Sequence, residues 1–250
     1  IAQRSGAQVA VEVVAETGST NADLLARAAA LAAPTLLVAE HQTAGRGRAG
    51  RSWLSAPGDS LTFSLAWKFD LPLQQLAGLP LAVGVALADA LAACGVQVQL
   101  KWPNDVLKDG SKLAGVLIET QAAPGGGIWA VIGIGMNLRM PDELEQRIGR
   151  SVAAAPWLAR MDRDDLMAAI LASLAAALGE FRQAGFGAFS ARWNRLHAWQ
   201  GRRVSILDNG TVLHDGLAAG VDDSGRLLLD CDEGRITVLA GDVSLRTRED

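Results

Sequence analysis

Apolar and polar positions repeat with two different periods along this chain, which predicts a mixture of strands and helices. In SLTFSLAW (60–67) every second residue is apolar, and this period of two predicts a strand. In 164–183 the apolar residues recur every three or four positions, which predicts an amphipathic helix. The residues expected on its buried face are Leu166, Ile170, Leu174, Leu178 and Phe181.

The same periodicities predict most of the other elements of residues 1–199. Further strands are expected at 9–15, 35–40, 96–102, 112–120 and 128–138, and further helices at 23–33, 76–94 and 187–199. Ser19 or Thr20 can cap the first helix, with Asp23 in its first turn. The glycine-rich segment APGGG joins the last two strands, which predicts an antiparallel hairpin.

The pattern changes at Gly201, where short alternating segments are separated by tight-turn pairs. These pairs are Asn209-Gly210, Ser224-Gly225 and Glu233-Gly234. Such a pattern predicts a small β-barrel appended to an α+β domain. We therefore expect two domains, one over residues 1–199 and one over residues 200–250.

Composition narrows the class of protein. The 250 residues are 50% hydrophobic and carry a net charge of −4, which argues against a general nucleic-acid-binding protein. The most apolar stretch, 76–95, contains Pro80 and Asp89 and is expected to be a buried helix rather than a membrane span. No signal peptide is apparent, so a cytoplasmic location is expected.

Residues 42–55 (QTAGRGRAGRSWLS) are a local exception to the acidic composition. Three arginines alternate with three glycines and a tryptophan follows. Glycine lets a backbone approach a ligand closely, and the planar arginine side chain matches phosphate or carboxylate. The residues alone leave three interpretations open: an anion-binding loop, a nucleic-acid patch, or a solvated charged loop.

Three more segments are candidates for chemistry. In KWPNDVL (101–107), Asp105 could hold Mg²⁺ or could simply belong to a turn that ends a strand. In SKLAGVLIE (111–119), Lys112 could face an anionic ligand beside Gly115, or could be a strand-end lysine. In VIGIGMNL (131–138), Gly133 indicates a close backbone approach and Asn137 could bond a base or sugar.

Taken in order, these segments resemble biotin protein ligase (biotin–[acetyl-CoA-carboxylase] ligase) from about residue 11 to residue 247. The resemblance rests on ETGSTN, EHQTAGRGRAGRSW, KWPNDV, KLAGVLIE, IGIGMNL and GDVSLR. It implies a mixed-sheet catalytic domain of the class II synthetase type, followed by an SH3-like β-barrel. It also implies condensation of biotin with ATP, using Mg²⁺, into biotinyl-5′-AMP. Biotin then passes to one lysine of the biotin carboxyl carrier protein of acetyl-CoA carboxylase or a related carboxylase.

The resemblance assigns roles to residues of this chain by motif. The implied catalytic residues are Lys112, Arg48 and Arg46. The implied biotin-binding residues are Ser19, Thr20, Asn21, Gln42, Gly45, Arg46, Gly47, Arg48, Lys112, Gly115 and Gly133. Trp53, Asn104 and Asn137 are placed on the ATP side, and Asp105 is the implied metal ligand.

Other functions remain open at this stage. A lipoate or octanoate ligase or transferase is expected to share the fold, and a regulator that binds biotinyl-AMP without catalysis is a second alternative. A nucleic-acid-binding module is a third. About ten residues precede the first strand, so we expect an enzyme without an N-terminal DNA-binding domain, and no DNA or membrane partner. Either a monomer or a homodimer is compatible with the resemblance.

Overall fold

A seven-stranded mixed sheet forms the centre of the larger part of the protein. The computed structural model describes residues 1–148, 152–208, 211–239 and 243–247. The sheet order is β1-β2-β3-β7-β6-β5-β4, with β1 and β2 parallel and the other neighbours antiparallel. The strands are β1 (Ala10–Thr17), β2 (Thr35–Gln42), β3 (Ser60–Phe69), β4 (Gln99–Lys101), β5 (Asp105–Lys108), β6 (Ser111–Ala122) and β7 (Ile128–Asn137).

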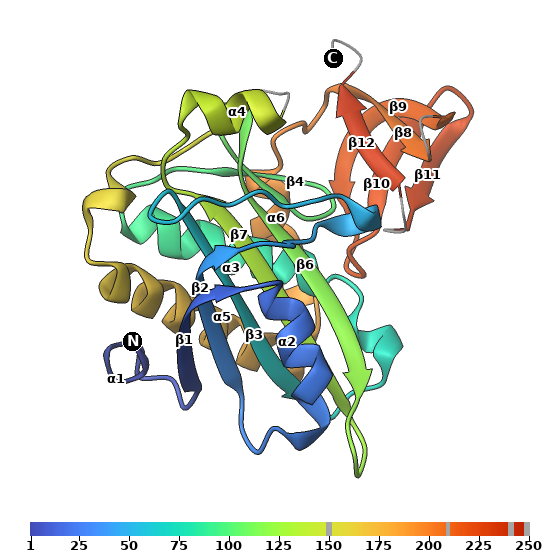
Figure 1. Cartoon of the computed structure of the whole chain (residues 1–250). Helices are drawn as coiled ribbons and strands as arrows, with labels where there is room; N and C mark the ends of the chain where they lie inside the picture. Colours follow the sequence, from blue (N-terminus) through green and yellow to red (C-terminus); the bar gives the residue numbers. More distant parts are fainter. Residues whose placement is uncertain (149–151, 209–210, 240–242, 248–250) are drawn as a thin grey trace.

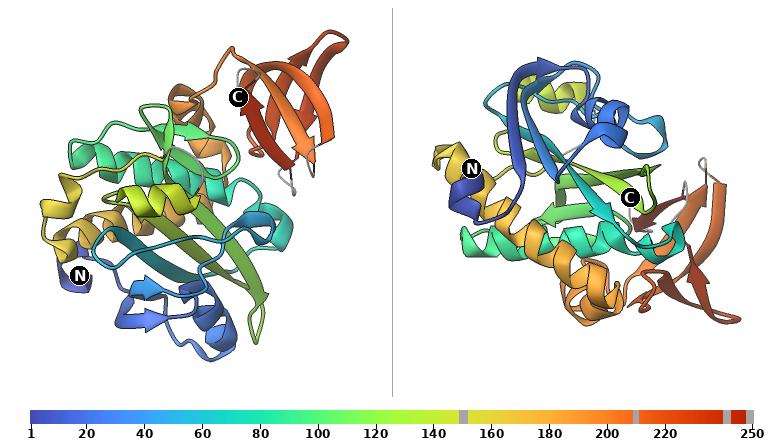
Figure 2. Two further views of the ribbon diagram at one scale, coloured as in Figure 1. Left: turned by 45° about the horizontal axis from the view of Figure 1, so that its top comes forward. Right: turned by 90° about the horizontal axis from the view of Figure 1, so that it is seen from below.

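Helices cover both faces of this sheet, as Figures 1 and 2 show. The long helices α3 and α5 and the shorter α6 lie on one face, and α2 lies on the other. The helices are α1 (Ala2–Ser5), α2 (Thr20–Arg27), α3 (Leu79–Ala93), α4 (Asp142–Ile148), α5 (Arg163–Ala184) and α6 (Gly187–Leu196). Ser19 caps α2, since its side chain accepts a hydrogen bond from the backbone nitrogen of Ala22.

The main hydrophobic core lies between the sheet and the face covered by α3 and α5. Leu61, Phe63 and Leu65 of β3 point into it, as the period of two predicts. The five residues expected on the buried face of α5 are all buried there. On the opposite face, Leu24 of α2 packs in a smaller cluster with Leu37 of β2. The remainder of that face is left open for the pocket described below.

The apolar helix predicted at 76–94 is a core element. The helical stretch Leu73–Ala93 is apolar and long enough to cross a membrane, but most of it is buried inside the protein. Helix α3 is buried along nearly its whole length, both by the sheet and by α5. Its apolar character therefore reflects packing inside the protein.

The C-terminal part forms a separate five-stranded antiparallel sheet, which confirms the predicted fold class. Its order is β11-β10-β9-β8-β12. The strands are β8 (Arg203–Asp208), β9 (Thr211–Val221), β10 (Leu227–Cys231), β11 (Gly234–Val238) and β12 (Val243–Thr247). The turns predicted at Ser224-Gly225 and Glu233-Gly234 join consecutive strands, whereas Asn209-Gly210 lies outside the described residues.

The β9–β10 turn of the C-terminal sheet contacts the larger part of the protein beside α3. The indole nitrogen of the buried Trp102 donates a hydrogen bond to the carbonyl of Gly225 at 3.2 Å. A side chain at Gly225 would approach the Cα of Gly78 to 2.8 Å, so glycine is required for this contact. The boundary between residues 199 and 200 remains a prediction.

Several elements differ in length from the sequence prediction. The strand expected at 96–102 shrinks to β4, because the backbone of Val96 still bonds to the carbonyl of Leu91 at the end of α3. The helix expected at 23–33 ends at Arg27 and is followed by a short 3₁₀ turn (Ala28–Ala30). Strand β5 was expected to be a turn. It forms because residues 105–108 pair with both β4 and β6.

His197 at the end of α6 makes the stability of the fold dependent on pH. His197 is 5% exposed, and the centres of its ring and of the Trp193 ring are 4.7 Å apart. Burial lowers the pKa of His197 from 6.5 to about 4. Below pH 6.5 the unfolded chain therefore binds a proton that the folded chain does not, and the free energy of unfolding falls as the pH falls toward 4.

We expect His197 to account for a loss of about 3 kcal/mol of stability between pH 7 and pH 4. Urea unfolding at both pH values measures it, with His197→Phe as the test variant. The exposed His214, changed to glutamine, is the matched control. If His197→Phe loses as much stability on acidification as wild type, the buried imidazole is not the cause.

Candidate active site

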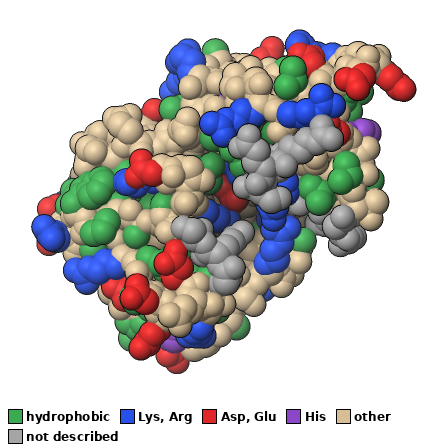
Figure 3. Space-filling view, turned by 90° about the horizontal axis from the view of Figure 1, so that it is seen from above, with side chains coloured by type: hydrophobic (Ala, Val, Ile, Leu, Met, Phe, Trp, Pro, Cys, Tyr) green, Lys and Arg blue, Asp and Glu red, His purple; other side chains and the backbone are tan. Residues whose placement is uncertain are grey.

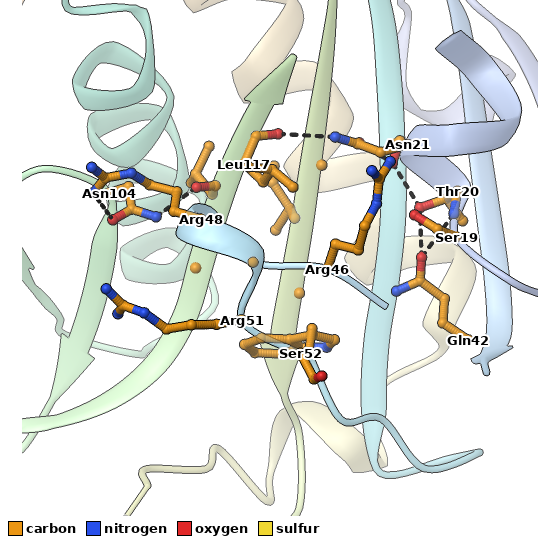
Figure 4. Close-up of a pocket in the computed structure, with 18 of the residues that line it drawn as sticks. Ser19, Thr20, Asn21, Gln42, Arg46, Arg48, Arg51, Ser52, Asn104 and Leu117 are labelled. Atoms are coloured by element: carbon orange, nitrogen blue, oxygen red, sulfur yellow. Dashed lines mark hydrogen bonds between the residues drawn. The ribbon is translucent and has the colours of Figure 1, made fainter. Parts of the chain in front are cut away.

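A pocket lies on the α2 side of the large sheet, between the N-terminus of α2 and the arginine loop (residues 43–59). Figure 4 shows its polar side chains pointing toward one another from α2, β2, the loop and the β4–β5 turn. The predicted residues that line it are Ser19, Thr20, Asn21, Gln42, Arg46, Gly47, Arg48, Trp53, Asn104, Asp105, Lys112, Gly115 and Gly133. The structure therefore brings most of the predicted site together.

Two predicted residues lie outside the pocket lining. A side chain at Gly45 would approach the carbonyl oxygen of Trp53 to 2.6 Å, so glycine here allows the backbones of Gly45 and Trp53 to pair across the loop. Asn137 is buried, and its amide donates to the carbonyls of Ala153 at 3.2 Å and Lys112 at 3.4 Å. In this structure both residues lie next to the site without lining it, and their predicted contacts with ligand remain predictions.

Glycines make the floor of the pocket flat. In the sheet, Gly115 pairs with Gly135, and Gly133 lies between Leu117 and Ser64. A Cβ at Gly133 would overlap the side-chain amide of Asn21, and one at Gly135 would overlap the ring of Trp53. The close approach predicted for Gly133 is therefore made by a side chain of the protein itself.

A polar cluster closes the end of the pocket beside α2. Gln42 Oε1 accepts from the Thr20 backbone nitrogen at 2.8 Å and lies 3.0 Å from Thr20 Oγ1. Thr20 Oγ1 lies 2.6 Å from Ser64 Oγ, and Ser64 Oγ lies 2.6 Å from Asn21 Oδ1. Thr20, Asn21 and Ser64 are all buried. These hydrogen bonds hold Thr20, Asn21, Gln42 and Ser64 to one another, so the cluster presents a fixed pattern to a ligand.

Two arginines of the loop are held by residues on the far side of the pocket. Arg48 Nη1 donates to Asn104 Oδ1 at 3.2 Å, and Asn104 Nδ2 donates to the carbonyl of Val116 at 2.7 Å. Arg46 Nη2 lies 3.5 Å from Glu119 Oε2 on β6. The loop makes a short 3₁₀ turn (Arg48–Gly50), with Ala49 at a φ of 53°. Both anchored arginines line the pocket.

Lys112 and Asp105 face each other at the opposite end of the pocket from α2. Their Nζ and Oδ1 atoms are 2.6 Å apart, and each side chain is about one-fifth exposed. A side chain at Gly115 would approach Lys112 Nζ to 2.8 Å, so this glycine leaves room for the lysine. Trp53 lies nearby, with its ring centre 5.9 Å from Lys112 Nζ and its buried indole nitrogen without a hydrogen-bond partner among the described residues.

Sequence reasoning missed several residues of the lining. Ser64, Phe63, Val116, Leu117 and Ile134 come from the sheet, Ser52 from the loop, and Arg246 from the C-terminal domain. Gly135 and Arg51 belong to two of the motifs singled out above but were given no site role, and they also line the pocket. The alternation in 60–67 could have indicated Ser64, since it puts the serines on one face. No local signal indicates Arg246, because it lies far along the chain from the rest of the pocket.

The pocket is strongly cationic although the chain is acidic. Its described lining contains five cations (Arg46, Arg48, Arg51, Lys112 and Arg246) and one carboxylate, that of Asp105. Figure 3 shows lysine and arginine side chains gathered around a hollow on this face of the molecule. Such a site suits a ligand that carries several negative charges, as a nucleoside triphosphate does.

Comparison with protein families identifies the family to which the chain belongs. The family described as "Biotin/lipoate A/B protein ligase family" matches residues 12–137, which contain nearly all of the pocket. The family described as "Biotin protein ligase C terminal domain" matches residues 201–246. The chain belongs to the biotin protein ligase family.

Individual biotin protein ligases align along most of the chain. "Biotin--[acetyl-CoA-carboxylase] ligase" of Mycobacterium tuberculosis is 38% identical over 93% of this chain and 88% of its own length. "Bifunctional ligase/repressor BirA" of Escherichia coli is 34% identical over all of this chain and 77% of its own length. The structure of the Aquifex aeolicus biotin protein ligase in complex with biotin and ATP superposes with a TM-score of 0.79. It is 29% identical, and the match covers 95% of this chain and 99% of that chain.

Proposed function

We propose that the pocket binds biotin and ATP next to each other and joins them as biotinyl-5′-AMP. As a biotin protein ligase, the enzyme then transfers biotin to a lysine of a carboxylase carrier protein. The observation that supports this arrangement best is the single pocket that connects the α2 cluster with Lys112 and the arginine loop. A neutral polar end and a cationic end suit the two ends of the biotinyl-adenylate.

We assign the biotin ring to the end beside α2. There Ser19, Thr20, Asn21 and Gln42 supply polar groups, and Gly115 and Gly133 keep the floor open for the ring and tail. The cluster is built from amide and hydroxyl groups and suits the uncharged ring of biotin. A lipoyl or octanoyl group has no N–H or C=O in the corresponding position, so the cluster favours biotin over the alternative substrates.

We assign the chemical step to the cationic end. The carboxylate of biotin attacks the α-phosphorus of ATP, pyrophosphate leaves, and a mixed anhydride forms. Lys112, Arg46 and Arg48 offset the repulsion between the carboxylate and the triphosphate and stabilise the charge at the α-phosphate. The carrier lysine then attacks the anhydride carbonyl and AMP leaves. Neither step needs a covalent nucleophile from the enzyme.

We place the nucleotide beside Trp53 and Asn104, with Asn137 behind them. The indole nitrogen of Trp53 has no hydrogen-bond partner in the part of the chain that the structure describes, and it is a buried polar atom that a ligand group can satisfy. Arg246 brings a further cation to the pocket from β12. Through Arg246, we expect the C-terminal domain to take part in binding ATP.

Asp105 fits the implied Mg²⁺, since magnesium in nucleotide sites is commonly held by one or two carboxylates together with phosphate oxygens. No group of three or more histidine, cysteine, aspartate or glutamate side chains in the described part of the chain could hold a metal by itself. When bound, Mg²⁺ would neutralise charge on the triphosphate. Asp105 also holds Lys112 in place through their ion pair.

We expect Asp105→Asn to raise the Mg²⁺ concentration needed for adenylate formation while leaving the affinity for biotin nearly unchanged. The amide is a weaker ligand for a hard cation, and Asp105 lies away from the α2 cluster. Pyrophosphate release at increasing Mg²⁺ measures the first effect, and calorimetry with biotin alone measures the second. An unchanged Mg²⁺ dependence would mean that Asp105 acts only as the partner of Lys112.

We further propose acetyl-CoA carboxylase as the source of the carrier and the cytoplasm as the location. A homodimer and a monomer are both compatible with this proposal. Binding of biotin against lipoate by calorimetry tests the substrate class. Biotin should bind much more tightly than lipoate, whereas comparable binding would favour the lipoate alternative.

A further inference from the structure

Glu119 on β6 lies where the α2 cluster meets the arginine loop. Its Oε2 accepts from Asn21 Nδ2 at 2.8 Å and lies 3.5 Å from Arg46 Nη2. The side chain of Glu119 is 28% exposed, and Asn21 is 3% exposed. One carboxylate oxygen therefore contacts both a buried residue of the cluster and an arginine of the loop.

Glu119 and the carbonyl of Leu117 together determine which way the amide of Asn21 points. An ionised carboxylate can only accept hydrogen bonds, so the NH₂ group of Asn21 must face it. The carbonyl of Leu117 accepts from the same NH₂ group at 3.3 Å. As a result Asn21 Oδ1 faces Ser64 Oγ.

This orientation makes the cluster rich in acceptors. Three oxygen–oxygen contacts form a chain: Asn21 Oδ1 to Ser64 Oγ, Ser64 Oγ to Thr20 Oγ1, and Thr20 Oγ1 to Gln42 Oε1. Each contact requires a hydrogen between its two oxygens. The two hydroxyls supply only two hydrogens, and Gln42 Oε1 already accepts from the backbone of Thr20. Among the described residues, one of these three contacts therefore has no hydrogen between its two oxygens.

We propose that Glu119 is a positioning residue for substrate selection. It holds the α2 cluster in an acceptor-rich state that selects a ligand with N–H donors, and it couples this cluster to the loop through Arg46. The proposal rests on the assignment of the biotin ring to this end of the pocket. The cyclic urea of biotin offers N–H donors, whereas the ring of lipoate offers none.

Glu119→Gln tests the proposal with almost no change of shape. A glutamine can present its own NH₂ group to Asn21, so that only the carbonyl of Leu117 still requires the NH₂ group of Asn21 to face it. An asparagine amide that reverses would give up this contact and supply the missing hydrogen to Ser64. The variant also removes the charge that faces Arg46. We expect about tenfold weaker binding of biotin, because a hydrogen bond to a charged group is lost. The ratio of biotin to lipoate affinity should fall, and kcat at saturating biotin should fall less than the affinity for biotin, since Glu119 contacts Arg46 but does not itself line the pocket.

Calorimetry and steady-state kinetics on the full chain measure these quantities, with Glu12→Gln as the matched control. Glu12 lies on β1, pairs with Arg27, and does not line the pocket. The control should bind biotin as wild type does. If wild type itself fails to bind biotin, the proposed function fails; if wild type binds and Glu119→Gln binds equally well, only the present inference is overturned.

The coupling to the loop is tested separately with Arg46→Ala and the double variant. We expect the losses in biotin affinity to be less than additive, because the two side chains share one contact. Thermal unfolding of each variant identifies any loss of the fold. Additive losses of biotin affinity would mean that Glu119 has only a structural role. The same conclusion would follow if the loss of biotin affinity in Glu119→Gln matched a fall in its melting temperature and left the biotin-to-lipoate ratio unchanged.

Discussion

Replacing Lys112 with alanine is expected to slow biotinyl-adenylate formation by roughly a few hundredfold, equivalent to about 3–4 kcal/mol. Lys112 Nζ lies in the cationic end of the pocket beside Asp105, where the carboxylate of biotin must meet the α-phosphate. This interaction strengthens as charge moves in the transition state, so the rate should fall more than the affinity for either substrate. Biotin-dependent release of pyrophosphate measures the effect.

Lys108→Ala is the matched control for this experiment. Lys108 also ends a strand, pairs with Asp109, and lies over the ring of Trp157 outside the pocket. Its removal should leave the rate close to that of wild type. If Lys112→Ala releases pyrophosphate as fast as Lys108→Ala does, Lys112 is a strand-end lysine without a part in the reaction.

Arg48→Gly is expected to keep some adenylate synthesis but to release biotinyl-AMP before transfer. Arg48 ties the loop to Asn104, which is itself bonded to β6. The substitution removes this contact and adds a glycine to a loop that already contains several, which raises the entropic cost of closing the loop. The escaped anhydride should react with lysines of unrelated proteins, so biotinylation of concentrated albumin should rise severalfold.

Arg51→Gly separates the two causes. It adds the same flexibility to the loop but leaves the Arg48–Asn104 contact in place. Bystander labelling should therefore rise less in Arg51→Gly than in Arg48→Gly when adenylate synthesis is matched. Equal labelling by wild type and Arg48→Gly would falsify the proposed retention of the adenylate by Arg48.

Local patterns predicted the type of nearly every long element of this fold. The apolar face of α5 and the APGGG hairpin are determined by neighbouring residues, and both form as predicted. Strand β5 and the shortened β4 depend on pairing between three separate segments. Sequence periodicity does not record such pairing, so these two elements were the least accurately predicted.

The candidate site was predicted where its residues lie within compact motifs. The arginine loop, Lys112 and the Ser19–Asn21 segment are all found at the pocket. Gly133 was correctly taken to mark a close approach, but periodicity cannot say that Asn21 is what approaches. Glu119 and Arg246 were missed because their contacts with the site depend on tertiary packing alone.

The central claim is that this pocket activates biotin for transfer to a carrier lysine. The most direct test incubates the purified protein with biotin, ATP, Mg²⁺ and the carrier domain of a carboxylase, and measures the mass of the carrier. We predict that one biotin is added, only when ATP is present, and that a carrier whose target lysine is replaced is not modified. An unmodified carrier in the presence of folded enzyme that binds both biotin and ATP would contradict the account.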